Sequence, residues 1–241
     1  MGERDDPSQE DNPYRQFLNP TELPGEVPSD SPESSGPGPL RTIWRSPRET
    51  IRRILATDPE LHVTLLICLA GIGESLNRAS NRNAGDQLSL EVILAFACIL
   101  GPLGGLFGVW MYSHLIRISG KWIDGRGVYE EIKAAIAWAS VPNVAGLVLW
   151  IPLLLISGEE SFTKDAPNLV ANSHLAIATL LLAIVQLALG IWSLVLLCNT
   201  IAEVQDYQSA WRGLGNLFLA GALLLIPLVI VALGLFLLFS L

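Results

Sequence analysis

The stretch LGNLFLAGALLLIPLVIVALGLFLLFSL, residues 214–241, contains no charged side chain and only two clearly polar ones, Asn216 and Ser240. A helix at the surface of a soluble core carries polar residues on one face, with a period of 3.6 residues, whereas this stretch is apolar on all faces. About 20 apolar residues are enough for a helix to cross the hydrocarbon of a bilayer. We therefore predict that residues 214–241 span a membrane.

Four further apolar stretches precede this one in the chain. They cover residues 61–76, 88–118, 132–156 and 169–198. None carries a charge near its centre, where one would cost about 2.5–3.5 kcal/mol on the insertion scale. The first is short, and the second is too short for two spans with a turn between them. The predicted fold class is all-α, a polytopic membrane helix bundle of five transmembrane helices over residues 61–241.

The amino-terminal residues 1–40 differ sharply from the rest in composition. They hold nine acidic residues and two basic ones, with repeated Pro and Ser, and so carry most of the formal net charge of −8. Such a segment buries too little apolar surface to offset the entropy that ordering costs. We predict a disordered acidic tail over residues 1–40.

Residues 41–60 lie between this tail and the first apolar stretch. Ser46, Pro47 and Glu49 have the spacing of a capping box with proline in the first helical turn. Isoleucines and leucine at helical spacing form one apolar face, with Arg48, Arg52 and Arg53 around it. We predict a basic amphipathic juxtamembrane helix, either on the cytoplasmic lipid surface or docked on the bundle.

The distribution of Lys and Arg predicts the orientation in the membrane. Residues 41–60 and the connections near 117–133 and 199–213 together hold ten basic residues, against three in connections 77–87 and 157–168. Cytoplasmic segments are the ones enriched in Lys and Arg. The amino terminus should therefore be cytoplasmic and the carboxyl terminus outside. The helix over 41–60 should share a cytoplasmic basic face with Arg117, Lys121 and Arg126.

A run of small residues lies in the second apolar stretch. Gly101 and Gly105, and likewise Gly104 and Gly108, are four residues apart, which permits close approach of another helix. Pro102 removes a backbone donor and predicts a kink. We interpret this run as a helix-packing seam, within the bundle or between two copies of the chain.

Polar residues and prolines occur near the middle of three other stretches. They are Pro142 and Asn143 in the third, Gln186 in the fourth and Pro227 in the fifth. Interrupted helices and amides at one depth are what a midplane substrate site needs. Amides also form hydrogen bonds between helices, and prolines are common in spans. A transporter or channel is therefore the alternative function.

No sequence pattern predicts catalysis or a metal site. The three histidines, His62, His114 and His174, are far apart in sequence, and the three cysteines all fall in apolar runs. Serine-hydrolase, zinc-protease and phosphate-loop motifs are absent from the sequence. We predict no enzyme, no cofactor and no nucleic-acid partner. The expected partners are the lipid bilayer and other membrane proteins or a second copy.

An ordered set of segments resembles the Yip domain family, which is named for binding Ypt/Rab small GTPases. The similarity covers residues 41–241, and its segments are Ser46–Arg53, Leu69–Ile72, Gly101–Gly108, Gly120–Gly127 leading through Glu130 and Glu131 to Ser140–Pro142, Gly190–Ser193 and Ile201–Val204. The resemblance implies five spans with a cytoplasmic amino terminus. It also implies a role in membrane organisation or traffic through protein contacts, with a small GTPase as one candidate partner. The short loops look more like those of bacterial members, which implies the cytoplasmic (inner) membrane.

Overall fold

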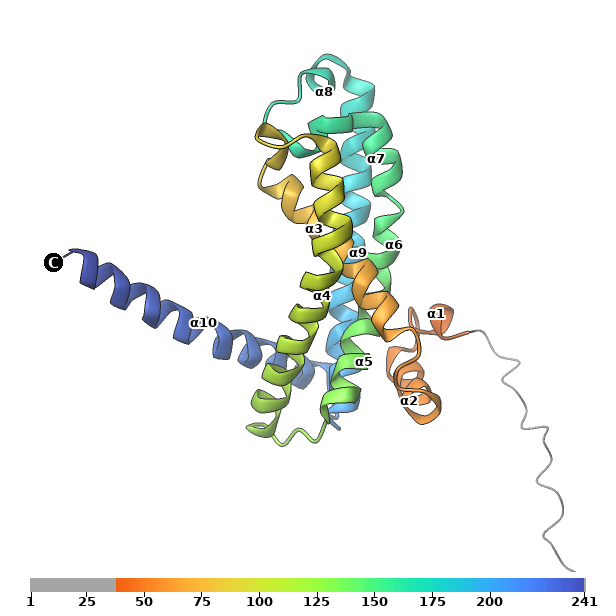
Figure 1. Ribbon diagram of the computed structural model, residues 1–241. Helices are drawn as coiled ribbons and strands as arrows, with labels where there is room; N and C mark the ends of the chain where they lie inside the picture. The colour runs from red at the N-terminus through yellow and green to blue at the C-terminus, as the bar shows by residue number, and fades with distance from the viewer. Residues whose placement is uncertain (1–37, 241) are drawn as a thin grey trace, which may run out of the picture. The chain divides into compact units, whose positions relative to one another are not determined.

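The computed structural model describes residues 38–240, and within the last helix it describes side chains as far as Ile226, with Val229 in addition. The predicted tail lies outside the described residues except at its end, where the first helix begins at Pro39. All regular elements in the described part are helical (Figure 1). They are α1 (Pro39–Thr42), α2 (Pro47–Thr57), α3 (Val63–Asn81), α4 (Leu90–Lys121), α5 (Tyr129–Ala139), α6 (Val141–Leu147), α7 (Trp150–Ser157), α8 (Pro167–Ala171), α9 (Ser173–Val204) and α10 (Ala210–Ser240), with short 3-10 helices η3 (Ala84–Asp86) and η4 (Gly158–Phe162).

The long helices pack side by side and bury two clusters of apolar side chains. α3 lies against α4 and α6, and α9 lies against α5, α6 and α7 (Figure 1). Trp138 of α5 and Ile201 of α9 are completely buried between them. The first part of α10 packs on α9 and α4 and buries Leu217 and Ala220.

Three of the five predicted spans correspond to helical segments that are long and apolar enough to cross a membrane. These are Leu90–Lys121, Val141–Phe162 and Ser173–Val204. α10 contributes a shorter apolar helix, Ala210–Ile226, within the part whose side chains are described. α3 has 19 residues but is not among the helices that meet the criterion of length and apolar composition.

The third predicted span is three short helices in series rather than one. Its two prolines lie where helices begin, with Pro142 second in α6 and Pro152 third in α7. The first turn of a helix is where a missing N–H loses no intrahelical hydrogen bond. In the middle of one long helix the same prolines would clash with the preceding turn. The breaks between α5, α6 and α7 therefore avoid the clash that Pro142 and Pro152 would each cause inside a continuous helix.

The basic amphipathic helix α2 docks on the bundle through its apolar face. Ile51 and Ile54 are buried, and α2 packs against α9 and α5. The helix begins at Pro47 as predicted, but the Ser46 side chain forms no capping hydrogen bond, so the predicted capping box was wrong. Instead the Ser46 carbonyl accepts hydrogen bonds from the Thr50 amide and hydroxyl.

Hydroxyl groups join α9 to α5 inside the bundle. The Ser193 hydroxyl donates to the Ala139 carbonyl at 2.7 Å, and the Thr200 hydroxyl to the Ala135 carbonyl at 3.2 Å. Both hydroxyl side chains are buried. Hydrogen bonds of this kind contribute about 0.6 kcal/mol each between membrane helices.

The glycine seam of α4, Gly101–Gly108, divides into two faces. A Cβ atom on Gly101 would lie 2.9 Å from the Gly71 carbonyl oxygen of α3, and one on Gly105 would lie 2.7 Å from the Ile67 carbonyl oxygen. These two glycines let the backbones of α3 and α4 touch. Gly104 has open space where its Cβ would be, as does Gly108. α4 continues as one helix through Pro102.

This division predicts opposite effects for two neighbouring substitutions. Gly101→Ala should lower the free energy of unfolding in detergent micelles by about 1–3 kcal/mol, because the methyl group forces α3 and α4 apart. Gly104→Ala meets no atom and gains helix propensity, so the free energy of unfolding should stay equal or rise. Equal losses in the two variants would contradict the assignment of the two faces.

Candidate functional site

A buried glutamine joins three segments at one end of the bundle. Gln205 follows α9 and is 1% exposed. Its Oε1 accepts a hydrogen bond from the Gly127 amide at 3.0 Å, and its Nε2 donates to the Ile116 carbonyl at 3.3 Å. The Gln205 carbonyl also accepts from the Arg126 amide at 3.3 Å. The end of α4, the connection from α4 to α5 and the end of α9 are thus held by one residue.

Three glycines make room for this side chain. A Cβ on Gly120 would collide with the Gln205 amide nitrogen, and one on Gly125 would collide with its Oε1. On Gly127 it would lie 2.8 Å from the Val204 carbonyl oxygen. Only glycine therefore fits at these three positions. We call the connection Gly120–Gly127, which surrounds the Gln205 side chain, the cradle.

Both helices that end here do so in the same local structure. The Tyr207 amide donates to the Ala202 carbonyl at 2.7 Å, and the Gly125 amide to the Gly120 carbonyl at 2.8 Å. Each of these hydrogen bonds closes a six-residue turn of the kind found in the Schellman motif at the carboxyl end of a helix. This motif requires one residue with a left-handed backbone conformation. That residue is Asp206 after α9 (φ 61°) and Asp124 after α4 (φ 64°). Aspartate tolerates this conformation better than most residues other than glycine.

Three further polar side chains complete this polar junction, which we define as Gln205, Tyr207, Asn216, Ser119 and the cradle Gly120–Gly127. The Ser119 hydroxyl donates to the Asn216 Oδ1 at 2.7 Å, and the Tyr207 hydroxyl to the Gly120 carbonyl at 3.3 Å. Burial raises the pKa of Tyr207 above its usual value; nearby Arg212 lowers it and Asp124 raises it. Tyr207 therefore stays a neutral hydrogen-bond donor at physiological pH.

The predicted basic face consists of two kinds of residue. Arg48, Arg52 and Arg126 hold the segment 203–207 on which the junction rests. The Arg52 guanidinium pairs with the Glu203 carboxylate at 2.6 Å and Arg126 with Asp206 at 3.6 Å, while Arg48 donates to the Tyr207 carbonyl at 3.3 Å.

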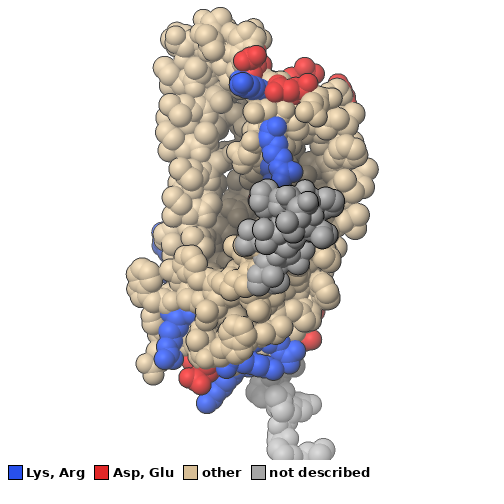
Figure 2. Space-filling model, turned by 90° about the vertical axis from the view of Figure 1, so that its left-hand side faces the viewer, with Lys and Arg blue, Asp and Glu red and all other residues tan. Residues whose placement is uncertain are grey.

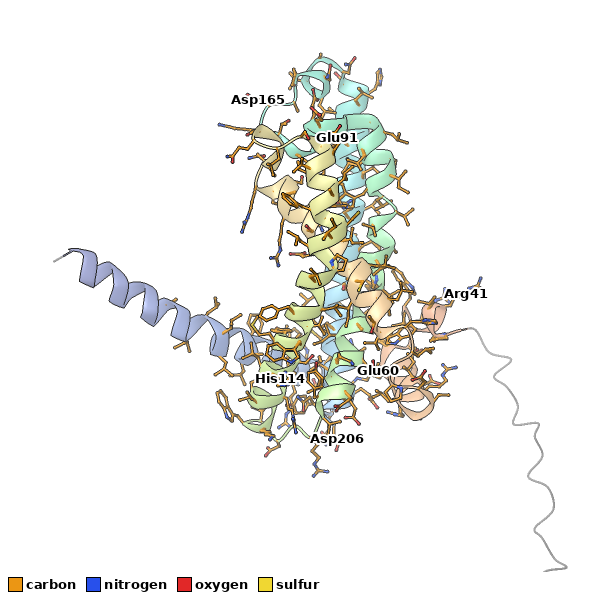
Figure 3. All side chains as sticks on the ribbon, viewed as in Figure 1. Arg41, Glu60, Glu91, His114, Asp165 and Asp206 are labelled. Carbon is orange, nitrogen blue, oxygen red and sulfur yellow. The ribbon has the colours of Figure 1, made fainter. Side chains whose placement is uncertain are left out.

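The remaining three residues of the basic face, Arg53, Arg117 and Lys121, are exposed. None of them forms an ion pair with another residue of the described part. On the face seen in Figure 2, most of the visible charged side chains lie towards the two ends of the bundle. His114 and Asp206 mark the end with the junction in Figure 3, and Glu91 and Asp165 the opposite end.

The predicted midplane cluster is partly assembled. Asn143 and Gln186 line one small cavity of about 30 Å³, together with Asn77 of α3. Pro142 is buried but does not line this cavity. Pro227 lies outside the residues whose side chains are described. The structure thus brings the two predicted amides together and adds a third.

The histidines have separate surroundings. The His62 ring lies 6.5 Å from that of Trp138, and the His114 ring lies 4.7 Å from that of Tyr129. Among the described residues, no three His, Cys, Asp or Glu side chains come together as metal ligands would.

The polar junction itself was not predicted from the sequence. Gln205 and Tyr207 lie in a short polar connection, a context that usually indicates solvent exposure. The available signal was the three glycines at 120, 125 and 127, because closely spaced glycines indicate that another group approaches the backbone.

Comparison with known proteins identifies one family. A family model described as the Yip1 domain matches residues 41–239. No curated protein and no solved structure matches the chain.

The polar junction predicts that loss of the Gln205 side-chain amide lowers the free energy of unfolding. Gln205→Leu keeps the side-chain size but leaves the buried Gly127 amide without an acceptor, so the free energy of unfolding in mixed micelles should fall by about 1–3 kcal/mol. Asn199→Leu is the matched control, because the Asn199 amide bonds only to the Val195 carbonyl of its own helix. Equal stability of Gln205→Leu and the unmodified protein would show that the junction is not a stabilising element.

Proposed function

The chain belongs to the Yip1 domain family, and on that basis we propose that it is a non-enzymatic integral membrane protein that acts through contacts with other proteins. The family match covers the region that contains all the apolar helices and α2. The proposed role is membrane organisation or traffic, which requires a surface that recognises partners rather than a catalytic centre.

We propose five spans, formed by α3, α4, the α5–α6–α7 segment, α9 and α10. The amino terminus is then cytoplasmic and the carboxyl terminus outside. Support comes from the ends of the helices: the segments that hold ten basic residues converge at the polar junction. The three other basic residues of residues 38–240 belong to segments at the opposite end, where the Ser80 hydroxyl donates to the Ser161 carbonyl. An excess of Lys and Arg is typical of the cytoplasmic side.

The observation that carries the partner role is the exposed part of the basic face. Arg53 projects from a helix that is docked on the bundle by its buried isoleucines, so its backbone is held in place. Lys121 projects from the last turn of α4, directly beside the cradle, and Arg117 projects one turn earlier. Charges on such fixed elements lose little entropy on binding, which favours recognition of an acidic protein surface. A small GTPase is one candidate of this kind, suggested by family resemblance.

This role predicts that charge reversal at one end of the bundle abolishes partner capture. Arg53→Glu combined with Lys121→Glu should reduce the proteins cross-linked to the chain in native membranes, measured by quantitative mass spectrometry, by about tenfold or more, since like charges across an interface cost several kcal/mol. Arg82→Glu combined with Lys164→Glu makes the same change of charge at the opposite end and should leave the set of partners unchanged.

Two outcomes would count against this function. One is a chain that recovers no protein partner and remains monomeric in mild detergent. The other is capture that falls equally in both double variants, because a general loss of membrane integrity, and not a specific surface, would then explain it.

Transport is the second candidate function, and it rests on the shared cavity of Asn143 and Gln186. The volume of that cavity, about 30 Å³, holds one or two water molecules, which is small for a metabolite. A transport role would require the cavity to widen and to open towards both sides.

The double variant Asn143→Leu with Gln186→Leu separates the two functions. If the amides only assist packing, partner capture should stay within about twofold, because a polar side chain between membrane helices contributes only about 0.6 kcal/mol. A transporter should instead lose its flux of small uncharged solutes into proteoliposomes, measured by light scattering. Loss of flux with unchanged capture would favour transport over the proposed function.

A further inference from the structure

Two adjacent cavities lie between α3, α7 and α9. The smaller one, which we call the amide cavity, is lined by Asn77, Asn143 and Gln186 and has a volume of about 30 Å³. The larger one, which we call the vestibule, measures about 290 Å³ and reaches Thr179 and η4. Asn77 and Gln186 line both, together with Trp150, so the two cavities share part of their walls.

Two buried polar atoms in these walls have no hydrogen-bond partner among the described residues. They are the Gln186 Nε2, in the wall that the cavities share, and the Ser161 Oγ, which lines the vestibule. An unsatisfied buried donor costs about 1–3 kcal/mol, so such atoms in native proteins usually bond to ordered water or a ligand. A cavity needs about 10–15 Å³ for each water molecule, a condition that the amide cavity meets.

The chemistry of the walls favours an uncharged ligand. They present amides and hydroxyls, and no Lys or Arg lines either cavity. The one carboxylate, that of Glu160, already accepts hydrogen bonds from the amides of Asn168 (2.8 Å) and Leu169 (3.1 Å) at the start of α8. No cationic side chain is therefore available to an anion, and both carboxylate oxygens of Glu160 are already engaged at the start of α8.

The vestibule gives these cavities an opening at one end of the bundle. The vestibule is bounded by η4 and α8, near the end that Asp165 marks in Figure 3. Towards the polar junction, apolar side chains of α5 and α9 pack closely against one another. Ala135, Trp138 and Ile201 there are completely buried.

We propose that the amide cavity and the vestibule form one hydrated pocket that binds water and small uncharged hydrogen-bonding solutes. The Gln186 amide is its innermost donor. The pocket opens on the side of the membrane where η4 and α8 lie. This inference does not depend on the proposed protein partners, since it concerns the opposite half of the bundle.

Cysteine accessibility tests this pocket in the full-length chain. Cys68, Cys98 and Cys198 are replaced by alanine, and Thr179→Cys, Ala183→Cys or Gln186→Cys is added singly. Vesicles of each orientation are treated with the charged, membrane-impermeant reagent methanethiosulfonate ethyltrimethylammonium, and modification is followed by intact-protein mass spectrometry. All three thiols should react from the side of η4 and α8 and from no other.

The matched controls are the sequence neighbours of Gln186. Val185 and Leu187 are 45% and 65% exposed on the outside of the bundle at nearly the same depth. Leu187→Cys and Val185→Cys should react at least about tenfold more slowly than Gln186→Cys, because a thiol in hydrocarbon does not ionise to the reactive thiolate. Ala183→Cys is close in size to the native residue and carries the test if Gln186→Cys does not fold.

Three results would overturn the proposal. Reaction of Thr179→Cys without reaction of either deeper cysteine would mean that water stops at the vestibule. Reaction from both sides would mean that the path is continuous through the bundle. Equal rates for Gln186→Cys and its two neighbours would mean that the interior of the bundle is no wetter than its outer surface.

Discussion

The organisation of this protein depends on one buried amide. The Gln205 side chain accepts one hydrogen bond, from the Gly127 amide, and donates one, to the Ile116 carbonyl; these partners are 78 and 89 residues away in sequence. Water cannot substitute for these partners at a site that is 1% exposed. The connection from α4 to α5 must therefore close over Gln205 in one conformation, and the cradle glycines are the residues that allow it. The start of α10 is fixed by the same arrangement, through the bond between Ser119 and Asn216.

The rest of the bundle follows the rules of packing in an apolar solvent. Hydrophobic burial gives little advantage between helices when the surroundings are lipid, so close backbone contact and hydrogen bonds become important. Gly71, Gly101 and Gly105 provide the contact between α3 and α4, and Ser193 and Thr200 provide hydrogen bonds between α9 and α5. α2 is stabilised differently, because its isoleucines pack on the bundle while Arg52 forms an ion pair at the surface. The Arg52–Glu203 pair is partly exposed and stabilises less than its short distance suggests.

The sequence predicted the parts that depend on composition. The ranges 88–118 and 169–198 agree with α4 and α9 to within six residues at each end, because an uninterrupted apolar run leaves few alternatives. Asn77 was missed as a partner of Gln186 because α3 extends to Asn81, five residues beyond the end of its apolar stretch. The turns at Asp124 and Asp206 could not be predicted, since the left-handed residue in each is an aspartate where glycine is the usual signal. Gln205 was missed for a related reason, because its burial arises from segments that are distant in sequence.

The contact between α3 and α4 has a consequence for how the protein reaches the membrane. α3 does not meet the criterion of length and apolar composition by itself, whereas α4, which follows after a connection of eight residues, meets it fully. A marginal segment gains stability when it leaves the translocation machinery together with a strongly apolar neighbour. The glycines that let the two backbones touch therefore make α3 and α4 a hairpin suited to insertion as one unit. On the proposed five-span topology, α3 then enters the membrane together with α4.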